Sequence, residues 1–402
     1  MFFNSHFILG GGAVGKHTLD LINSNFIVTA NNVKPLLAIW PVNSSDTIQN
    51  VKFVLPAKAN SLAVSPDGCY LVAGIQENLY VWQIATGRML TMLTKHYQPI
   101  NCIKFTDDGS HFISGGQDGQ VIVWSLSAVV GNPYQTEAVE QLYAFSDHAL
   151  PVTDMWIGTG GMRGFLVTVS MDRTCKLYDL VSGTMLLSLV FQEMLTAVTL
   201  DRVEIGLFVG TSLGNIYHYR LQPQPRTREY HITDDDKLNN KFAGHTKAIT
   251  CLAISLDDQT LMSGSEDSNV MTWNIQSRSL LKTLQHKGAI TNAVFILTPR
   301  VMFDREAKLE LITKNFQRMK DGAESTNNEV IEVMTTTEMD SSAFMSDIFS
   351  STRCRSKASN GFSSVGGADN DSEIKKLKAE VEQLRKVNKE LFEFSAKNVM
   401  KS

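Results

Sequence analysis

Three groups of residues in this chain have the side-chain types of a serine hydrolase. In each group a His is followed by a Ser or Thr and then by an Asp. In a hydrolase the Ser hydroxyl attacks the substrate, the His accepts the proton and the Asp orients the His. With the aromatic residue that follows, the groups are His96, Ser114, Asp118 and Trp124; His148, Thr168 or Ser170, Asp172 and Tyr178; and His245, Ser263, Asp267 and Trp273.

The repetition of this set argues against catalysis. The Asp follows the His by 22, 24 and 22 residues, and the aromatic residue follows each Asp by 6. A nucleophile would not recur at one spacing, whereas a repeated structural unit needs the same polar contacts each time. A buried polar group without a partner costs about 1–3 kcal/mol. We therefore expect each set to be a buried hydrogen-bond network that fixes one structural unit, and no catalytic site.

A second stretch has the composition of a phosphate-binding loop. Residues 10–16 fit the pattern GxGxxG and nearly fit GxxxxGK[ST], but His17 stands where a Ser or Thr would hold Mg²⁺. The residues that follow, 19–22 and 26–30, have the pattern of short strands rather than of a strand and a helix, and no acidic residue about 20 positions on could hold a ribose. We expect a flexible glycine loop and no nucleotide, metal or other cofactor.

Short strands must position the three polar sets. The aromatic residues that end the third strand of each unit are Trp40, Trp82, Trp124, Tyr178, Tyr217 or Tyr219, and Trp273. The first three are 42 residues apart, within the period of about 40–45 residues that WD40 repeats have. Turn signals at 66–68, 108–109 and 257–258 separate apolar runs. Such repeats form one four-stranded sheet each around an axis, so we expect an all-β, WD40-type β-propeller that serves as a surface for other macromolecules.

The regular repeat is interrupted at two insertions and at the closing blade. The insertions, 127–146 and 222–240, are polar or contain Pro, and we expect loops there. Six blades are recognisable, and a seventh must be assembled from 290–297, 301–303, 308–313 and the N-terminal residues 5–10. Propellers avoid exposed strand edges when the two chain ends share a blade. We therefore predict seven blades, the last of them degraded.

Composition narrows the class of function and the compartment. The formal charge is −4 and the pI is about 6.2, which does not favour the reading of nucleic-acid sequence. The five cysteines are scattered without the spacing of a zinc site, which indicates a reduced, intracellular environment. The short apolar stretch at 7–9 does not resemble a secretory signal, and no apolar run is long enough to span a membrane.

The last third of the chain changes in composition twice. Residues 1–319 are expected to form the propeller, and 320–372, rich in polar residues, a disordered linker. Residues 373–399 have the pattern of a helix with an a/d seam, which favours a parallel coiled-coil homodimer over packing on the chain's own propeller. The seam consists of Ile374, Leu377, Val381, Leu384, Asn388 and Leu391.

The combination of repeats, linker and terminal helix resembles the WD repeat-containing protein 18 family. The likeness runs from about residue 25 to the end, apart from most of 300–370. It is most specific at 96–105 with 112–119, at 148–156 and at 384–397. WD repeats alone serve many functions, so the resemblance depends on their combination with the terminal stretch.

This resemblance implies a non-enzymatic scaffold subunit of a nuclear complex, the rixosome, with helical-repeat scaffold subunits as partners. The complex acts in rRNA processing and in maturation of the 60S ribosomal subunit, in the nucleolus and the nucleoplasm. The resemblance also implies a midasin-type ATPase and pre-60S particles as partners through the complex, self-pairing of the terminal helices, and a family-level link to DNA replication licensing. Direct contact with nucleic acid is left open. The alternative is a WD40 substrate receptor of a ubiquitin ligase, or a chromatin-reader propeller.

Overall fold

The described part of the chain is built almost entirely from strands. The computed structural model describes residues 5–11, 14–44, 46–48, 53–131, 139–222, 227–232, 241–299, 309, 311 and 313–319. All of them belong to a unit that extends from Met1 to Met334. The expected linker, 320–372, and the expected helix, 373–399, with its six seam residues, lie outside the described residues. Helical structure within them consists of α1 (Leu126–Val130) and a 3₁₀ turn (Gly161–Arg163).

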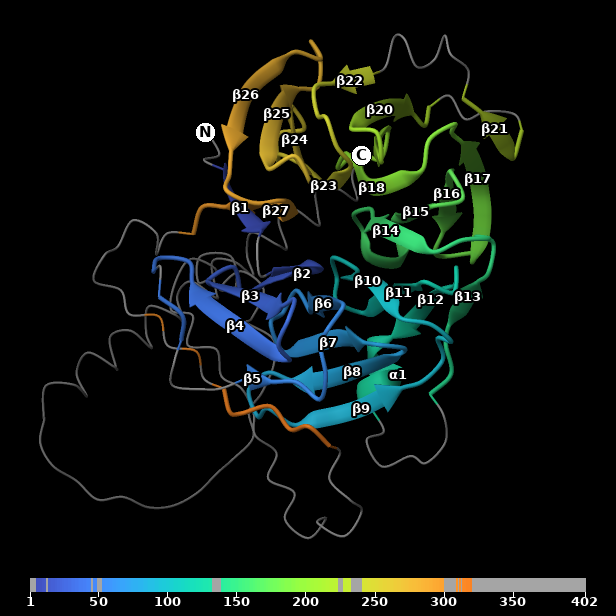
Figure 1. Cartoon of the computed structure of the whole chain (residues 1–402). Coiled ribbons are helices and arrows are strands. Elements are labelled where there is room, and N and C mark those ends of the chain that lie inside the picture. The colour runs from blue at the N-terminus through green and yellow to red at the C-terminus, as the bar shows by residue number, and fades with distance from the viewer. Residues whose placement is uncertain are drawn as a thin grey trace, which may run out of the picture. The chain divides into compact units, whose positions relative to one another are not determined.

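Six sheets of at least four strands surround a central axis (Figure 1). We call them blades 1 to 6. Blade 1 consists of β2 (Val14–Ile22), β3 (Phe26–Asn31), β4 (Leu36–Pro41) and β5 (Phe53–Val54). Blade 2 consists of β6 (Ser61–Val64), β7 (Tyr70–Ile75), β8 (Asn78–Gln83) and β9 (Met89–Leu93). Blade 3 consists of β10 (Ile100–Phe105), β11 (His111–Gly116), β12 (Val121–Ser125) and β13 (Tyr143–Phe145).

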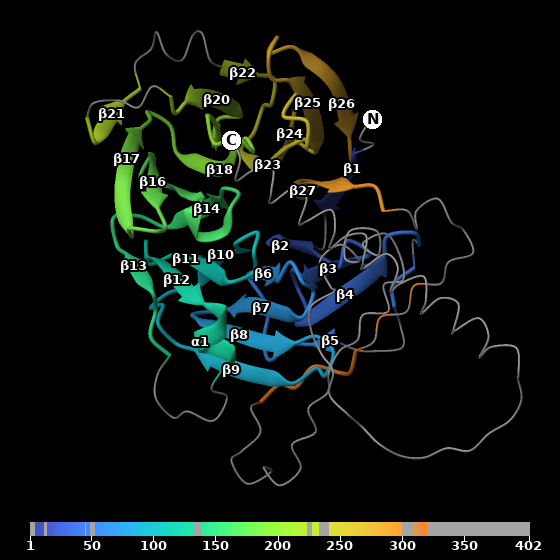
Figure 2. The ribbon, with the colours of Figure 1, turned by 180° about the vertical axis from the view of Figure 1, so that it is seen from behind.

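The other three blades continue the ring in chain order. Blade 4 consists of β14 (Val152–Ile157), β15 (Phe165–Ser170), β16 (Thr174–Asp179), β17 (Thr184–Val190) and β21 (Glu229–His231). Blade 5 consists of β18 (Leu195–Leu200), β19 (Gly206–Thr211), β20 (Asn215–Arg220) and β22 (Lys241–Ala243). Blade 6 consists of β23 (Ile249–Ile254), β24 (Thr260–Ser265), β25 (Asn269–Asn274) and β26 (Leu280–Gln285). Seen from behind, the same ring is evident (Figure 2).

The two ends of the described propeller meet in a seventh, smaller sheet. β1 (Ser5–Gly11) pairs antiparallel with β27 (Ile290–Leu297), as predicted for 5–10 and 290–297. First strands contact one another around the ring in the order β2, β6, β10, β14, β18, β23, β27 and back to β2. The described part of this sheet holds two strands, so seven complete blades stay a prediction.

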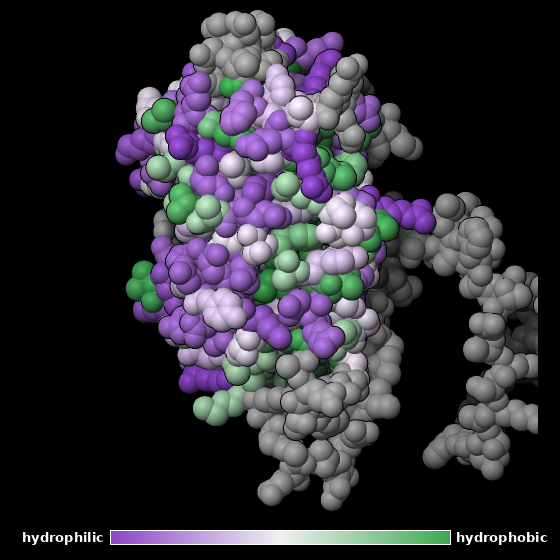
Figure 3. All heavy atoms as spheres, turned by 90° about the vertical axis from the view of Figure 1, so that its right-hand side faces the viewer, coloured by the Kyte–Doolittle hydropathy of each residue, from purple (hydrophilic) through white to green (hydrophobic). Residues whose placement is uncertain are grey.

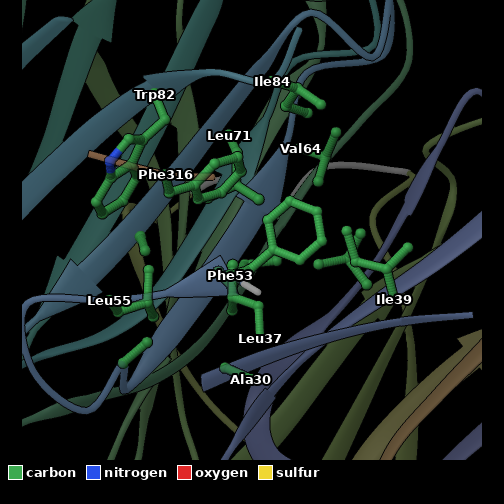
Figure 4. Close-up of a cluster of buried hydrophobic side chains, with 14 of the residues drawn as sticks. Ala30, Leu37, Ile39, Phe53, Leu55, Val64, Leu71, Trp82, Ile84 and Phe316 are labelled. Atoms are coloured by element: carbon green, nitrogen blue, oxygen red, sulfur yellow. The ribbon is translucent and has the colours of Figure 1, made fainter. Parts of the chain in front are cut away.

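Apolar clusters between neighbouring blades hold the ring together. Both faces of an inner strand are covered, so these strands are apolar runs rather than alternating ones; all four residues of β6 and all six of β19 are buried. The cluster between blades 1 and 2 includes Phe53, Trp82 and Phe316 (Figure 4). Comparable clusters join each later blade to the next.

The structure corrects the expectation for three segments. The insertion 127–146 contains β13, the fourth strand of blade 3, and most of α1. The insertion 222–240 contains β21, which pairs parallel with the outer strand β17. Leu309 and Leu311 pack against the cluster of blades 1 and 2 instead of building the closing blade, and 301–303 lie outside the described residues. Three-residue strands and isolated apolar residues carry too little periodicity to be recognised.

The side wall of the propeller has a mixed surface. Figure 3 views the side that lies to the right in Figure 1, where β13, β17 and β21 are found, and shows hydrophilic residues among short hydrophobic stretches. In the described residues, no helix is long and apolar enough to cross a membrane.

Candidate functional site

The first polar set forms a continuous network inside blade 3. His96 Nδ1 donates to Asp118 Oδ2 over 3.1 Å, and His96 Nε2 pairs with Ser114 Oγ over 2.9 Å. Trp124 Nε1 donates to the same hydroxyl oxygen over 3.0 Å. With Nδ1 protonated, Nε2 accepts the Ser114 hydroxyl proton, which is the tautomer that a hydrolase would use. Ser114 is 0% exposed in the sheet, so no substrate can reach its hydroxyl.

Blade 6 repeats the network almost atom for atom. His245 Nδ1 lies 2.9 Å from Asp267 Oδ2, His245 Nε2 lies 2.8 Å from Ser263 Oγ, and Trp273 Nε1 donates to Ser263 Oγ over 2.9 Å. Ser263 is completely buried as well. The Asp is fixed further by the backbone N–H of Thr246 at 3.1 Å. Both blades therefore use the set to join the loop before the first strand to the turn after the second.

Blade 4 varies the same scheme. His148 Nδ1 pairs with Asp172 Oδ2 over 3.0 Å, and His148 Nε2 pairs with Thr168 Oγ1 over 2.7 Å. The other candidate, Ser170, donates instead to Leu150 O. Tyr178 donates its hydroxyl to Asp147 Oδ2 over 3.1 Å. Blades 3 and 6 have Lys95 and Gly244 at the position of Asp147, so this carboxylate partner is particular to blade 4.

Hydrogen bonds keep the Asp residues of these networks ionised. Burial alone would raise the pKa of Asp118, but hydrogen bonds from His96 and from the amides of Tyr97 and Gln120 lower it overall. The pKa values of Asp172 and Asp267 are lowered in the same way, against the effect of burial. Negative charge on each carboxylate strengthens the hydrogen bonds that it accepts.

Blades 2 and 5 satisfy their aromatic residues differently, and the sequence patterns missed both arrangements. In blade 5, Glu193 Oε1 accepts from the Tyr217 hydroxyl at 2.9 Å and from Asn215 Nδ2 at 3.0 Å. In blade 2, Trp82 Nε1 donates over 2.8 Å to the backbone oxygen of Gln317. The sequence indicates only that the usual network is missing from these blades, because no His–Asp pair stands before either aromatic residue at the usual spacing.

The segment 313–319, which we call the strap, is anchored to blade 2 by several contacts. Gln317 N donates to Gly87 O over 2.8 Å, and Gln317 Oε1 accepts from Met89 N at 3.1 Å. Phe316 stacks on Trp82 with ring centres 5.8 Å apart and an interplanar angle of 11° (Figure 4). Gly87 has φ +68°, and a Cβ there would lie 2.4 Å from Asn315 O, so this position requires Gly.

The described residues of the glycine motif lie in two strands, and a bulge begins at its last two residues. Gly10 lies in β1, and the residues after Val14 lie in β2. Val14 pairs with Asn31 and Leu19 with Thr29, which leaves residues 15–18 opposite a single residue of β3. The extra residues bulge out of the sheet. The expectation of a flexible loop is therefore wrong for residues 10–11 and 14–16, which belong to β1 and β2, and residues 12 and 13 lie outside the described residues.

This bulge, residues 15–18, crosses the central channel; we call it the cross-channel bulge. Lys16 Nζ donates to Thr196 O in blade 5 over 2.9 Å, and His17 Nε2 donates to Thr153 O in blade 4 over 3.0 Å. Burial lowers the pKa of His17 well below its usual value, and the ammonium groups of Lys16 and Lys104 add to this effect. A neutral His17 with Nε2 protonated fits the bond to Thr153 O.

The channel on the far side of the bulge holds a cavity of about 310 Å³. Asp20 and Asp154 line it, and each accepts a backbone N–H from the next blade, from Val64 at 2.7 Å and from Val198 at 3.0 Å. Burial raises the pKa of both carboxyl groups. Their oxygens are thus used to tie blades together. In the described residues, no group of three or more His, Cys, Asp or Glu is arranged to hold a metal ion.

The comparisons agree with this architecture. The family described as WD domain, G-beta repeat matches residues 87–125, 139–179 and 236–274. These stretches hold the three His–Asp networks. Repeated blades of this type around one axis define a WD40-repeat β-propeller protein.

Similar proteins assign the chain to a narrower family within this class. It is 34% identical to WD repeat-containing protein 18 of Danio rerio over 97% of this chain and 91% of that protein. The identity to WD repeat-containing protein 18 of Homo sapiens is also 34%, over 96% and 90%. The pre-rRNA-processing protein crb3/ipi3 of Schizosaccharomyces pombe is 27% identical over 65% of each chain. The chain belongs to the WD repeat-containing protein 18 family.

Proposed function

We propose that this chain is a non-enzymatic scaffold subunit in rRNA processing and maturation of the 60S ribosomal subunit. The observation that carries the proposal is family membership over nearly the whole chain, together with relatives that are named pre-rRNA-processing proteins in Schizosaccharomyces pombe and Caenorhabditis elegans. The buried Ser and Thr hydroxyls support a non-catalytic role, because the groups that resemble a triad are inaccessible. The matching family is a repeat module rather than a catalytic one.

The proposal extends to a complex of the rixosome type. Its partners would be helical-repeat scaffold subunits, with a midasin-type ATPase and pre-60S particles joined through the complex. The chain would act in the nucleus, in the nucleolus and the nucleoplasm, with the link to replication licensing as a property of the family. A propeller supports this role because its loops and side wall offer several separate surfaces on one rigid body.

Co-purification in the native organism tests this function. We expect tagged protein to sediment in part with pre-60S particles and to bring down helical-repeat proteins, and its depletion to cause precursors of the large-subunit rRNA to accumulate. Re-expressed wild-type protein should restore processing. Recovery of a ubiquitin-ligase adaptor or of histones, with normal rRNA processing after depletion, would support the alternative functions instead.

We propose further that the helix expected at 373–399 pairs with a second copy in parallel. Leu384→Ala would remove a seam side chain, which costs about 2–5 kcal/mol at a buried site and would split a pair of three heptads. Lys386→Ala, outside the seam, is the matched control and should leave the pair intact. Light scattering at tens of micromolar measures the oligomeric state of each variant. If wild type and Leu384→Ala are both monomeric, the helix pairs with another subunit instead.

A further inference from the structure

The mouth of the central channel is a bowl of about 580 Å³ whose floor is the cross-channel bulge. It lies on the face formed by the loops before the first strands and the turns after the second strands. Its polar lining carries two ammonium groups and four side-chain amides, and no carboxylate among the described residues. These residues are Lys16, Lys58, Asn32, Asn60, Asn101 and Gln117, and the polar side chains of His17 and Thr153 also line the bowl.

Several donors of this bowl already bond within the protein, but each of them has further N–H groups for a ligand. Lys16 uses one of its three N–H groups for Thr196 O, so two remain for other acceptors. Lys58 is exposed at the rim. Gln117 Nε2 donates to Asn101 Oδ1 over 3.2 Å, and Asn101 Nδ2 to Val152 O over 2.8 Å, which orders the amides on this side of the bowl.

An apolar shelf adjoins the bowl. A second hollow of about 470 Å³ shares Met171 with the bowl and is also lined by Leu150 and Met194. These three side chains are 45%, 48% and 53% exposed, respectively. Leu213 continues the shelf, since the backbone of its neighbour Ser212 donates to Met194 O. Adjacent exposed apolar residues indicate a binding surface, and Met adapts to differently shaped partners.

We propose that the bowl and shelf bind an extended protein segment that carries an acidic side chain next to an apolar one. The carboxylate enters the bowl and accepts hydrogen bonds from Lys58 and Lys16, as charge complementarity requires. The amides hydrogen-bond to the segment's backbone, and the apolar side chain covers Met171 and Met194. The inference does not depend on the role in rRNA processing.

A protein segment fits this surface better than a nucleic acid does. Binding along a phosphate backbone needs basic residues in a row, and single strands need aromatic stacking platforms. Here the two Lys residues line one bowl. The adjoining hollow is lined by aliphatic and Met side chains together with Gln192, and its one cation, Arg173, stands next to the carboxylate of Asp172. That combination favours one carboxylate with an apolar neighbour over a chain of phosphates.

Selection from a phage-displayed library of random 12-residue peptides on the purified full chain tests the proposal. We expect enriched peptides to carry Asp or Glu within two residues of Leu, Ile, Met or Phe. The most enriched peptide, labelled with fluorescein, then gives dissociation constants by polarisation. Lys58→Glu should weaken its binding at least tenfold, Lys58→Gln less, and Met194→Glu at least threefold.

Lys247→Glu is the matched control, because Lys247 is exposed and is not among the residues that line the bowl. It should leave the affinity unchanged, and melting temperatures should show that all variants are folded. Enriched peptides without acidic residues, or equal affinity for Lys58→Glu and wild type, would overturn the proposal. So would a 12-nucleotide polyuridylate that binds in a Lys58-dependent manner while no acidic peptide is enriched.

Discussion

Blades 2 and 3 are neighbours with equivalent Trp residues, yet they satisfy these residues by opposite means. In blade 3 the partner of Trp124 is Ser114, ten positions away in the same sheet. In blade 2 the partner of Trp82 is the backbone of Gln317, 235 positions away. A buried indole N–H needs a partner in either case. The difference shows that a blade without its own network can depend on a distant segment of the chain.

Blade 3 therefore completes its hydrogen bonds within its own residues, whereas blade 2 depends on the strap. The network of blade 3 is complete once residues 96–124 are folded, whereas the packing of Trp82 is complete only when the strap is in place. Substitutions in the strap should therefore affect blades 1 and 2 first, and substitutions in the His–Asp networks should act on their own blade.

The largest effect is expected from Phe316→Ala. Phe316 is 6% exposed and contacts both Trp82 and Phe53, and truncation of a buried Phe costs about 3–5 kcal/mol. Urea unfolding followed by tryptophan fluorescence measures the loss. Met319→Ala, at an exposed position of the same strap, is the control. Equal stability of Phe316→Ala and wild type would mean that the strap is dispensable for blade 2.

A smaller loss is expected from Asp118→Ala in blade 3. The change leaves the N–H groups of His96, Tyr97 and Gln120 without their carboxylate, at a cost of about 1–3 kcal/mol. Association with all partners should weaken together, because the blade and not one contact is damaged. Thermal unfolding of Asp118→Ala beside Glu266→Ala, an exposed acidic control, measures this. Loss of one partner at unchanged melting temperature would assign Asp118 a contact role.

Lys16→Ala should cost less, about 0.5–1.5 kcal/mol for the hydrogen bond to Thr196 O, and it also removes a positive charge that acts on the Asp154 carboxyl group. Neither wild type nor variant should bind ATP, GTP or NAD in calorimetry, since residues 14–16 are part of a strand rather than a phosphate loop. Nucleotide binding that Lys16→Ala abolishes would contradict this interpretation.

The smallest effect concerns pH. The pKa of Asp118 is lower in the folded chain than in the unfolded one, so the stability that its charge provides is present above the unfolded value of about 3.9. That stability is lost as the pH falls toward the folded pKa. Asp118→Asn should therefore be less stable than wild type at pH 7, and the gap should shrink by pH 3. A gap independent of pH in urea titrations would rule out this linkage.

The sequence predicts the repeated parts of this molecule well and the unrepeated parts poorly. The all-β WD40-type propeller and the pairing of 5–10 with 290–297 follow from spacing and from the need to cover strand edges. The contacts among His96, Ser114 and Asp118 also agree with the sequence pattern, because three copies of one spacing reveal it.

What the sequence does not reveal depends on contacts that occur once. The strap contains no periodic pattern, and Gln317 acts through its backbone oxygen, which any residue could provide. The stretch 10–16 resembles a phosphate loop in composition. Position 17 and the strand-like residues that follow argue against one, but they do not reveal that residues 15–18 bulge across the channel. Thr168 and Ser170 are equally plausible by type and lie on the same face of β15. Thr168 bonds to His148, and it stands four residues before the Asp of its set, as the Ser does in the other two sets.

The pairing of β1 with β27 means that the first strand to be synthesised finds its partner only late in translation. At about 5–20 residues per second, Ile290 leaves the ribosome roughly 15–60 s after Ser5. During that interval β1 has no partner from the closing sheet, and an unpaired strand edge is a template for aggregation. The contacts of Trp82 in blade 2 are completed later still, when Phe316 and Gln317 have been synthesised. Folding helpers that bind the early blades would therefore be needed until residues 290–319 have been synthesised.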